Sequence, residues 1–283
     1  MAIKPVEVEF GRVVDTLRAA GCVFAEDEAE LLISEAQDAT SLAAMVARRV
    51  EGEPLELVLG WAEFRGLRIA VEPGVFVPRQ RTAYLAELAE GFLAPGDVVV
   101  DLCCGAGAIG ASLLDTMRRR GEEHGGGGIE LHAADVSEVA VRCARKNLAT
   151  AINQGAAFVY QGDLDTPLPA SLAHRVSVLT ANVPYVPSAE ITLLPAEARE
   201  YEPLSALDGG SDGLDILRRV AEAAPRWLRP GGRVLIEISD RQQEPAVSAF
   251  RAAGLEPSVH ESADYYTTVL VGRFAQDPRE RTA

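Results

Sequence analysis

Residues 98–110 have the sequence Val-Val-Val-Asp-Leu-Cys-Cys-Gly-Ala-Gly-Ala-Ile-Gly, in which an apolar run passes directly into a glycine-rich turn. The continuous hydrophobicity of residues 98–102 is typical of a parallel strand that is buried on both faces. Gly105, Gly107 and Gly110 have the GxGxxG spacing, which lets the turn between a strand and a helix approach a ligand closely. We therefore predict a strand, a ligand-binding turn and a helix that begins after the turn.

Downstream of this turn, the pattern of apolar residues predicts alternating strands and helices. Further strands are expected at four short apolar runs, residues 129–136, 158–160, 176–181 and 234–238. A long helix is expected over 214–228, and two last strands near 257–260 and 267–274 are expected to form a hairpin at one edge. Repeated strand–helix units predict a parallel sheet with helices on both faces, which places the chain in the α/β class.

The first 60 residues differ from the rest, because between residues 6 and 50 their apolar side chains recur at helical spacing. We expect Asp27 to cap the second helix of this segment and Ser41 to cap the third.

Short β runs begin near Trp61 and predict a hairpin that connects the helices to the α/β part. Pro73 and Gly74 have turn chemistry and are expected to join a strand over 64–72 to a strand over 75–78. The expected organisation is a helical module over 1–60, a hairpin linker over 61–78, a catalytic domain over 79–275 and a polar tail over 276–283.

Composition restricts the classes of partner. The chain has 283 residues with 27 Lys or Arg and 42 Asp or Glu, so its formal net charge is −15. It shows no basic stripe of the kind that neutralises phosphates, which disfavours a nucleic-acid substrate. It also lacks both a signal peptide and an apolar run of the roughly 18 residues that a membrane span needs, so we expect a cytoplasmic protein. Its four cysteines and four histidines have no metal-ligand spacing, and no metal is expected.

Two carboxylates indicate which cofactor the glycine-rich turn would bind. Asp135 ends the second strand of the α/β part, where a carboxylate can bind ribose hydroxyls. The glycines alone would fit NAD. Asp101, however, ends the first strand and would repel a pyrophosphate, whereas it would suit the amino group of S-adenosylmethionine, a cationic cofactor without phosphates. A tight turn that binds nothing is the alternative at this point.

A second polar segment, Asn182-Val-Pro-Tyr185, follows the fourth strand at the edge where open α/β sheets place their sites. The Asn182 side-chain oxygen and the Val183 carbonyl can accept both N–H bonds of an amide or ring amino group, which turns the nitrogen lone pair toward a methyl donor. Pro184 favours an extended Val183, and the Tyr185 ring can pack against a planar amide or base. The segment predicts direct methyl transfer to nitrogen without a covalent nucleophile, and a loop with a core tyrosine is the alternative.

Together these motifs resemble the HemK/PrmC family of protein-(glutamine-N5) methyltransferases, and the resemblance extends over nearly the whole chain. Besides the two loops, it rests on the segments 48–60, 64–67, 71–79 and 201–214. It implies a Rossmann-like class I S-adenosylmethionine-dependent methyltransferase fold with a small N-terminal helical domain and a linking β-hairpin.

The resemblance also implies roles for single residues. Cys103 to Gly107 and Asp135 would hold S-adenosylmethionine, Asp163 and Leu164 would flank its adenine, and Asn182 to Tyr185 would bind the glutamine side chain. With Asp101 and Asn182 added, the expected cofactor site is complete. It comprises Asp101, Cys103, Cys104, Gly105, Ala106, Gly107, Asp135, Asp163, Leu164 and Asn182. The expected catalytic residues are Asn182, Val183, Pro184 and Tyr185.

The sequence departs from the family pattern in the substrate region. Val183 stands where the family signature has its first proline, and Arg81 and Ala83 stand where the family usually has acidic residues. In the family, the helical module contacts the protein partner. We expect a monomeric enzyme that methylates an exposed glutamine of a protein such as a release factor or ribosomal protein. Two alternatives stay open, an amino methyltransferase that acts on adenine in DNA or RNA, and a protein that binds S-adenosylmethionine without turnover.

Overall fold

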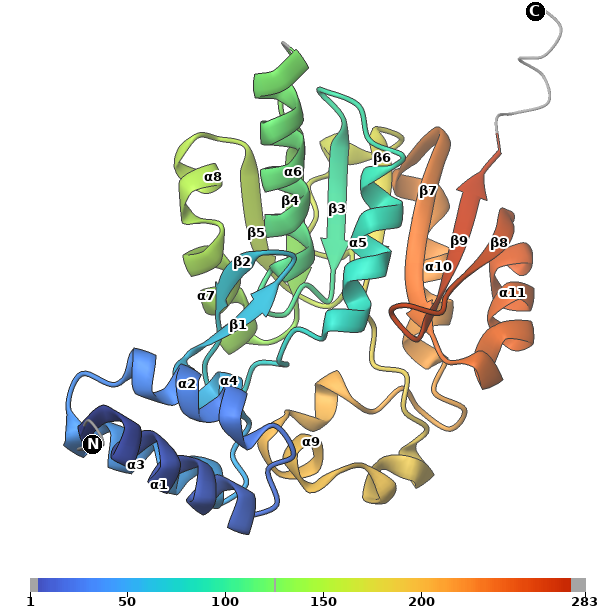
Figure 1. The fold of residues 1–283 in the computed structure, drawn as a ribbon. Coiled ribbons are helices and arrows are strands. Elements are labelled where there is room, and N and C mark those ends of the chain that lie inside the picture. Colours follow the sequence, from blue (N-terminus) through green and yellow to red (C-terminus); the bar gives the residue numbers. More distant parts are fainter. Residues whose placement is uncertain (1–4, 125, 276–283) are drawn as a thin grey trace, which may run out of the picture.

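A seven-stranded sheet forms the centre of the computed structural model, which describes residues 5–124 and 126–275 (Figure 1). The strand order is β5-β4-β3-β6-β7-β9-β8, and the strands are β3 (Val98–Leu102), β4 (Glu130–Asp135), β5 (Ala157–Gln161), β6 (Val176–Ala181), β7 (Leu228–Ile238), β8 (Leu255–Ser262) and β9 (Thr267–Phe274). Strands β3 to β7 are parallel, and β9 runs antiparallel to both β7 and β8. The predicted parallel sheet with an edge hairpin is confirmed.

Helices cover both faces of this sheet and bury a separate apolar core on each face. The first core contains side chains of α5 (Ala83–Glu90), α6 (Ala108–His124) and α7 (Glu138–Asn147), with the short α8 (Ala149–Asn153) beside it. The second core contains side chains of α10 (Asp215–Trp227) and α11 (Gln243–Ala252). All five residues of β3, including Asp101, are buried between the two layers, which confirms the predicted buried strand.

The N-terminal helices α1 (Pro5–Ala19), α2 (Ala25–Glu35), α3 (Ala39–Val50) and α4 (Leu55–Leu59) pack around a small core of their own. Both predicted caps are wrong. Helix α2 begins at Ala25, so Asp27 lies inside its first turn, where a carboxylate favours the helix dipole. The cap of α3 is Asp38, whose side chain accepts from the Ser41 N–H. The Ser41 side chain, at the third helical position, accepts from the Asp38 N–H, which completes a capping box.

The hairpin exists, but its turn is not where the sequence predicted it. Strands β1 (Trp61–Phe64) and β2 (Leu67–Ala70) are joined by Arg65 and Gly66, which both have positive φ as a type I′ turn requires. Pro73 and Gly74 form a separate turn, and the segment after them makes no strand. Val75 and Val77 instead pack into the first core of the sheet, which explains their apolar alternation.

A long segment between β6 and α10 lies below the carboxyl ends of the strands, next to the N-terminal helices (Figure 1). It contains a 3-10 helix, η3 (Ser188–Leu193), and the short helix α9 (Ala196–Tyr201). We call residues 188–213 the insert.

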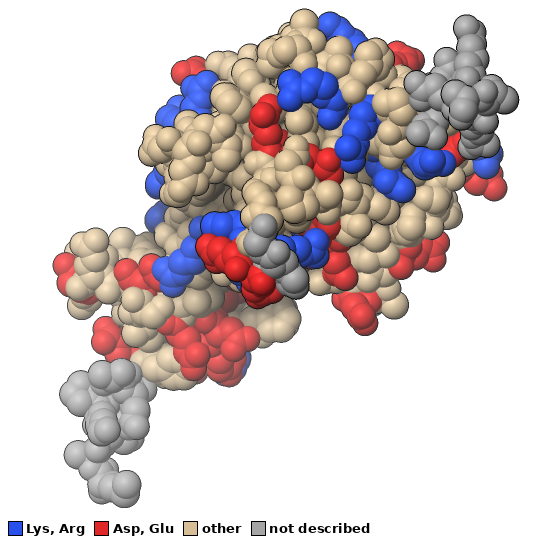
Figure 2. Space-filling view, turned by 90° about the horizontal axis from the view of Figure 1, so that it is seen from above, with Lys and Arg blue, Asp and Glu red and all other residues tan. Residues whose placement is uncertain are grey.

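At the end of the sheet opposite the carboxyl ends of the parallel strands, which we call the opposite edge, arginines are interspersed with carboxylates (Figure 2). Arg229 lies 3.0 Å from Asp97, and Arg273 lies 3.1 Å from Glu256. Within the described part of the chain, no helix combines the length and apolar character that crossing a membrane requires. The tail expected over 276–283 lies outside the described residues.

Candidate active site

A pocket of about 460 Å³ opens at the carboxyl edge of β3, β4 and β6. Its walls come from the loop after β3, the loop after β6, the segment that leaves the hairpin and the insert. This volume lies in the range that small-molecule sites usually have. The site is therefore at the edge at which the sequence placed it.

The loop over residues 103–107, which we call the cofactor loop, is bent by its own backbone. Cys103, Gly105 and Gly107 have φ values of 53°, 53° and 79°. The Gly105 N–H donates to one carboxylate oxygen of Asp135 and the Ser137 N–H to the other, both at 2.9 Å. These two bonds fix the Asp135 carboxylate at the pocket wall, although burial still raises its pKa.

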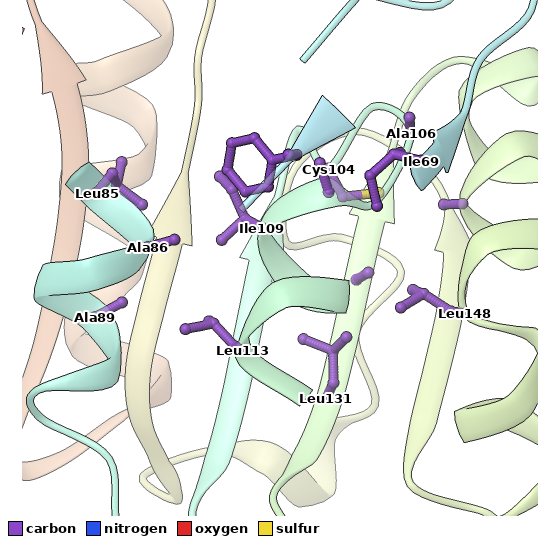
Figure 3. Close-up of a cluster of buried hydrophobic side chains, with 14 of the residues drawn as sticks. Ile69, Leu85, Ala86, Ala89, Cys104, Ala106, Ile109, Leu113, Leu131 and Leu148 are labelled. Atoms are coloured by element: carbon purple, nitrogen blue, oxygen red, sulfur yellow. The ribbon is translucent and has the colours of Figure 1, made fainter. Parts of the chain in front are cut away.

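The cofactor loop packs against the hairpin. Cys104 and Ala106 lie in the first core beside Ile69 of β2 (Figure 3). Asn147, at the end of α7, donates to the carbonyls of Ala106 at 2.8 Å and Ala70 at 2.9 Å. The loop and the hairpin are thus joined through one side chain that the sequence did not single out.

Asp101 and Gly107 do not line the pocket. The Asp101 side chain is fully buried beneath the cofactor loop, where one oxygen accepts from the Thr180 hydroxyl at 2.8 Å and the other has no partner among the described residues. Burial raises its pKa to about 7. The structure thus places Asp101 behind the pocket wall, with one oxygen bonded to Thr180 of β6, and the expected contact with a cofactor amino group stays a prediction.

The other expected cofactor residues do line the pocket. Asp163 is exposed and accepts from Arg219 at 2.7 Å, whereas Leu164 is buried and has a positive φ of 49°. The pocket wall contains Cys103, Cys104, Gly105, Ala106, Asp135, Asp163, Leu164 and Asn182 of the expected cofactor set.

The four residues Asn182 to Tyr185 follow the last residue of β6 and all line the same pocket. Asn182 is half-buried, and the Val183 side chain is 2% exposed within the second core. Since the Val183 side chain faces the core, the substitution of valine for proline keeps an apolar anchor at this position.

This second loop is held by the end of the insert. Val186 donates to the carbonyl of Leu207 at 3.0 Å and accepts from the Gly209 N–H at 2.9 Å. The Gln242 amide donates to the carbonyl of Tyr185 at 2.8 Å. A Cβ on Gly213 would overlap both the Tyr185 carbonyl and the Gln242 amide, so only glycine allows this close approach.

The Tyr185 hydroxyl accepts from Arg81, which lies in the 3-10 helix η1 (Gln80–Thr82). Arg81 also donates to Glu237 at 2.8 Å, and the Thr82 hydroxyl donates to the other Glu237 oxygen at 2.7 Å. Burial raises the pKa of Tyr185, and the positive charge of Arg81 opposes that rise.

Ion pairs connect the insert to the hairpin exit and to the helical module. Arg79 donates to Glu202 at 2.5 Å. Arg49 of α3 donates to Glu28 of α2 at 2.7 Å and to Glu197 of α9 at 2.6 Å. The helical module is therefore coupled directly to the wall of the pocket.

Comparison with known proteins identifies the family. Residues 66–190 match the family model described as methyltransferase small domain. The chain is 35% identical over 211 residues to the release factor glutamine methyltransferase of Geobacter sulfurreducens, a match that covers 74% of the chain and 69% of that protein. The protein of the same name from Mycolicibacterium smegmatis is 35% identical over 257 residues, which cover 84% of the chain and 86% of that protein. This chain belongs to the release factor glutamine methyltransferase family.

Solved structures show the same fold as this methyltransferase. A methyltransferase from Pyrococcus furiosus aligns with a TM-score of 0.53 and 16% identity, and covers 75% of the chain and 91% of its own length. The ribosomal protein L11 methylase of Lactobacillus delbrueckii subsp. bulgaricus aligns with a TM-score of 0.50 and 15% identity, over 74% of the chain and 86% of its own. The predicted Rossmann-like methyltransferase fold is confirmed.

Family and fold also settle the class of cofactor, because this chain is an S-adenosylmethionine-dependent methyltransferase. The pocket residues fit that molecule. Asp135 presents a fixed carboxylate suited to a ribose diol, and the pocket side of the cofactor loop carries small residues that permit close approach. The NAD alternative is thereby dropped.

The sequence did not predict the outer wall of the pocket. Residues of the hairpin exit and the insert complete it, namely Phe76, Arg79, Arg81, Leu194, Glu197, Glu202 and Pro203. There were two sequence signals. Segments 71–79 and 201–214 belong to the family resemblance, which gave them no role, and Arg81 stands in the substrate region where the family usually has an acidic residue.

Proposed function

We propose that this methyltransferase transfers a methyl group from S-adenosylmethionine to the side-chain amide nitrogen of a glutamine in a release factor. The observation that carries the proposal is that Asn182 to Tyr185 and the cofactor loop share one pocket. The names of the relatives from Geobacter sulfurreducens and Mycolicibacterium smegmatis support the choice of substrate.

Asn182 and Val183 would bind the amide that is to be methylated. The Asn182 side-chain oxygen and the Val183 carbonyl can each accept one N–H bond, so the nitrogen lone pair points away from both. The Tyr185 ring would pack against the flat face of the amide. As the bond between the nitrogen and the methyl carbon forms, the bond between that carbon and sulfur would break, with its electron pair kept on sulfur. The amide would release one N–H proton to water, and no residue of the chain would be bonded covalently.

Other residues of this chain would bind the cofactor. Asp135 would hold the ribose, and Asp163 and Leu164 would flank the adenine, as the resemblance implies. When bound, S-adenosylmethionine supplies an electrophilic methyl group on a sulfonium cation. The cofactor loop and Asn182 would hold the reactants in register, which is the main source of rate enhancement in a direct displacement.

We further propose that residues 1–60 recognise the protein substrate and that residues 79–275 carry the reaction. The contact of Arg49 with Glu197 supports this division, because it places the helical module against the outer wall of the pocket. We propose a cytoplasmic monomer as the working form. The pairing of arginines with carboxylates, seen for Arg229 and Arg273, favours a protein over a nucleic acid as substrate.

The test is to incubate the enzyme with labelled S-adenosylmethionine and a purified release factor from the same organism. We expect one glutamine to gain one methyl group by mass spectrometry, and Asn182→Ala to abolish the gain. Asn153→Ala removes an exposed asparagine of α8 far from the pocket and serves as the matched control. A parallel reaction contains DNA and RNA in place of the release factor. Label found in that nucleic acid alone would support the adenine alternative, and tight cofactor binding without product in either reaction would support the non-catalytic one.

A further inference from the structure

Arg81 occupies an unusual place for an arginine, between a buried carboxylate and the tyrosine of the substrate loop. It reaches this place from η1, directly after the hairpin, and it lines the pocket. Its Nε donates to Glu237 at 2.8 Å, and a second nitrogen donates to the Tyr185 hydroxyl. Three elements that are far apart in the sequence therefore meet at one guanidinium group.

Glu237 makes this arginine rigid. Its side chain is 3% exposed at the end of β7, in the interior of the sheet. The Thr82 hydroxyl donates to its second oxygen at 2.7 Å, so both carboxylate oxygens are occupied. A planar guanidinium can bond a carboxylate with one nitrogen and a further acceptor with another, which a lysine cannot do in a fixed geometry.

The far end of the Tyr185 side chain depends on this arrangement. Within residues 5–124 and 126–275, Arg81 is the hydrogen-bond partner that the structure gives to the Tyr185 hydroxyl. The Arg81 guanidinium also lies 5.6 Å from the centre of the Tyr185 ring, within range of a cation–π contact. Gln242 holds the Tyr185 carbonyl at 2.8 Å, so the residue is fixed at both ends.

We propose that Arg81 is a positioning residue. It connects the Tyr185 hydroxyl to Glu237 of β7 and thereby holds the Tyr185 ring against the glutamine amide. The proposal rests on the proposed function, because the ring matters only if a planar group binds to it. Arg81 acts through Tyr185 and does not touch the cofactor loop.

A double-mutant cycle tests this dependence. We expect Arg81→Gln and Tyr185→Phe each to lower kcat for release factor methylation by about 10-fold, and the double variant to be no slower than either, because both changes break the same contact. Arg273→Gln, at the opposite edge, is the matched control and should keep the activity of the wild type. Losses that multiply in the double variant, or a fully active Arg81→Gln, would overturn the proposal.

A second readout does not depend on methylation. NMR of ring-labelled tyrosine, with Tyr185→Phe to assign the signal, reports the phenol pKa. Arg81→Gln should raise this pKa, because the positive charge that favours the phenolate is lost, while the affinity for S-adenosylhomocysteine should stay unchanged. An unchanged phenol pKa would refute the contact itself. If the wild type methylates no release factor, the proposed function fails, and the titration still decides whether Arg81 holds Tyr185.

Discussion

The loops after β3 and β6 leave the same edge of the sheet from neighbouring strands, but they keep their shapes by different means. The cofactor loop is bent by three residues with positive φ. Its hydrogen bonds go to the elements next to it, from Cys104 and Gly105 to strand β4 and from Asn147 of α7 to the Ala106 carbonyl. Its geometry therefore depends on its own backbone and on its immediate neighbours in the fold.

The loop that contains Asn182 to Tyr185 depends on distant parts of the chain. The Tyr185 carbonyl is held by Gln242 of the 3-10 helix η5 (Asp240–Gln242), which precedes α11, and Val186 pairs with residues 207–209 of the insert. Changes far from this loop should thus impair substrate chemistry while the cofactor site stays intact. The variants below test that separation.

The largest effect is expected for Gly213→Ala. The new Cβ would overlap the Tyr185 carbonyl and the Gln242 amide, and φ at this position is +76°. Steric overlap of this kind in a packed region costs several kcal/mol, so we expect the free energy of unfolding to fall by about 3 kcal/mol. Because the substrate loop is displaced, we also expect kcat to fall by at least about 100-fold. Urea denaturation and methylation assays measure the two losses.

The control for this variant is Gly155→Ala. Gly155 also has a positive φ, of +73°, but a Cβ there would meet no atom within 4 Å. It should lose only the cost of the backbone conformation, about 1 kcal/mol, and keep full activity. Equal losses at both positions would show that backbone conformation matters and that the contact with the substrate loop does not.

The pH dependence of stability tests the base of the cofactor loop. Burial raises the pKa of Asp101 from 3.8 to about 7. The folded protein therefore binds a proton more tightly than the unfolded chain, and this contribution is complete below about pH 4 and is lost as the pH rises through about 7. We expect the wild type to lose up to about 4 kcal/mol across that window relative to Asp101→Asn, which stays neutral and can still accept from Thr180. Parallel pH profiles of the two proteins in urea denaturation would contradict this expectation.

Gln242→Ala should distinguish most clearly between an effect on the substrate loop and an effect on the cofactor loop. It removes the bonds from the Gln242 amide to the carbonyls of Tyr185 at 2.8 Å and Asp212 at 3.1 Å. We expect a drop of about 10-fold in kcat and a loss of about 1–3 kcal/mol in stability, because buried carbonyls lose their donor. Calorimetry should find an unchanged affinity for S-adenosylhomocysteine.

Gln154→Ala, at an exposed glutamine after α8, is the control for this change. A Gln242→Ala protein that binds S-adenosylhomocysteine weakly would show that the two loops are not independent.

The strands could be predicted from sequence because their signal is local. Residues 98–102 and 176–181 have the predicted bounds, since a strand buried on both faces is mostly apolar, and the buried polar side chains of Asp101, Ser177 and Thr180 interrupt these runs at single positions. The hairpin turn was missed, because the first of its two residues, Arg65, is a non-glycine residue with positive φ, and Gly66 alone is a weak turn signal. Pro73 and Gly74 carry a stronger local turn signal, although their turn joins no strands.

The same distinction applies to the site. Asn182 to Tyr185 and Asp135 could be predicted because each directly follows or ends a recognisable strand. Gln242 and Glu237 could not, and neither could the partners of Arg81, because these contacts arise only when the fold brings β7, η5 and η1 to the substrate loop. Asp101 was placed at the correct strand end, but sequence alone does not tell which way its side chain points.

The smallest effect is expected at the tie between the insert and the helical module. In Glu197→Gln, the amide replaces a half-exposed carboxylate that accepts from Arg49 at 2.6 Å, while the bond from Arg49 to Glu28 remains. A half-exposed ion pair contributes about 0.5 kcal/mol, so stability should hardly change. If the helical module presents the substrate to the pocket, KM for the release factor should rise by a few-fold with kcat unchanged. Glu256→Gln breaks a comparable exposed pair at the opposite edge and should leave KM as it is. A lower kcat at unchanged KM would instead mean that the insert acts on the Asn182–Tyr185 loop. The geometry of that loop would then depend on the helical module as well as on Gln242 and the insert.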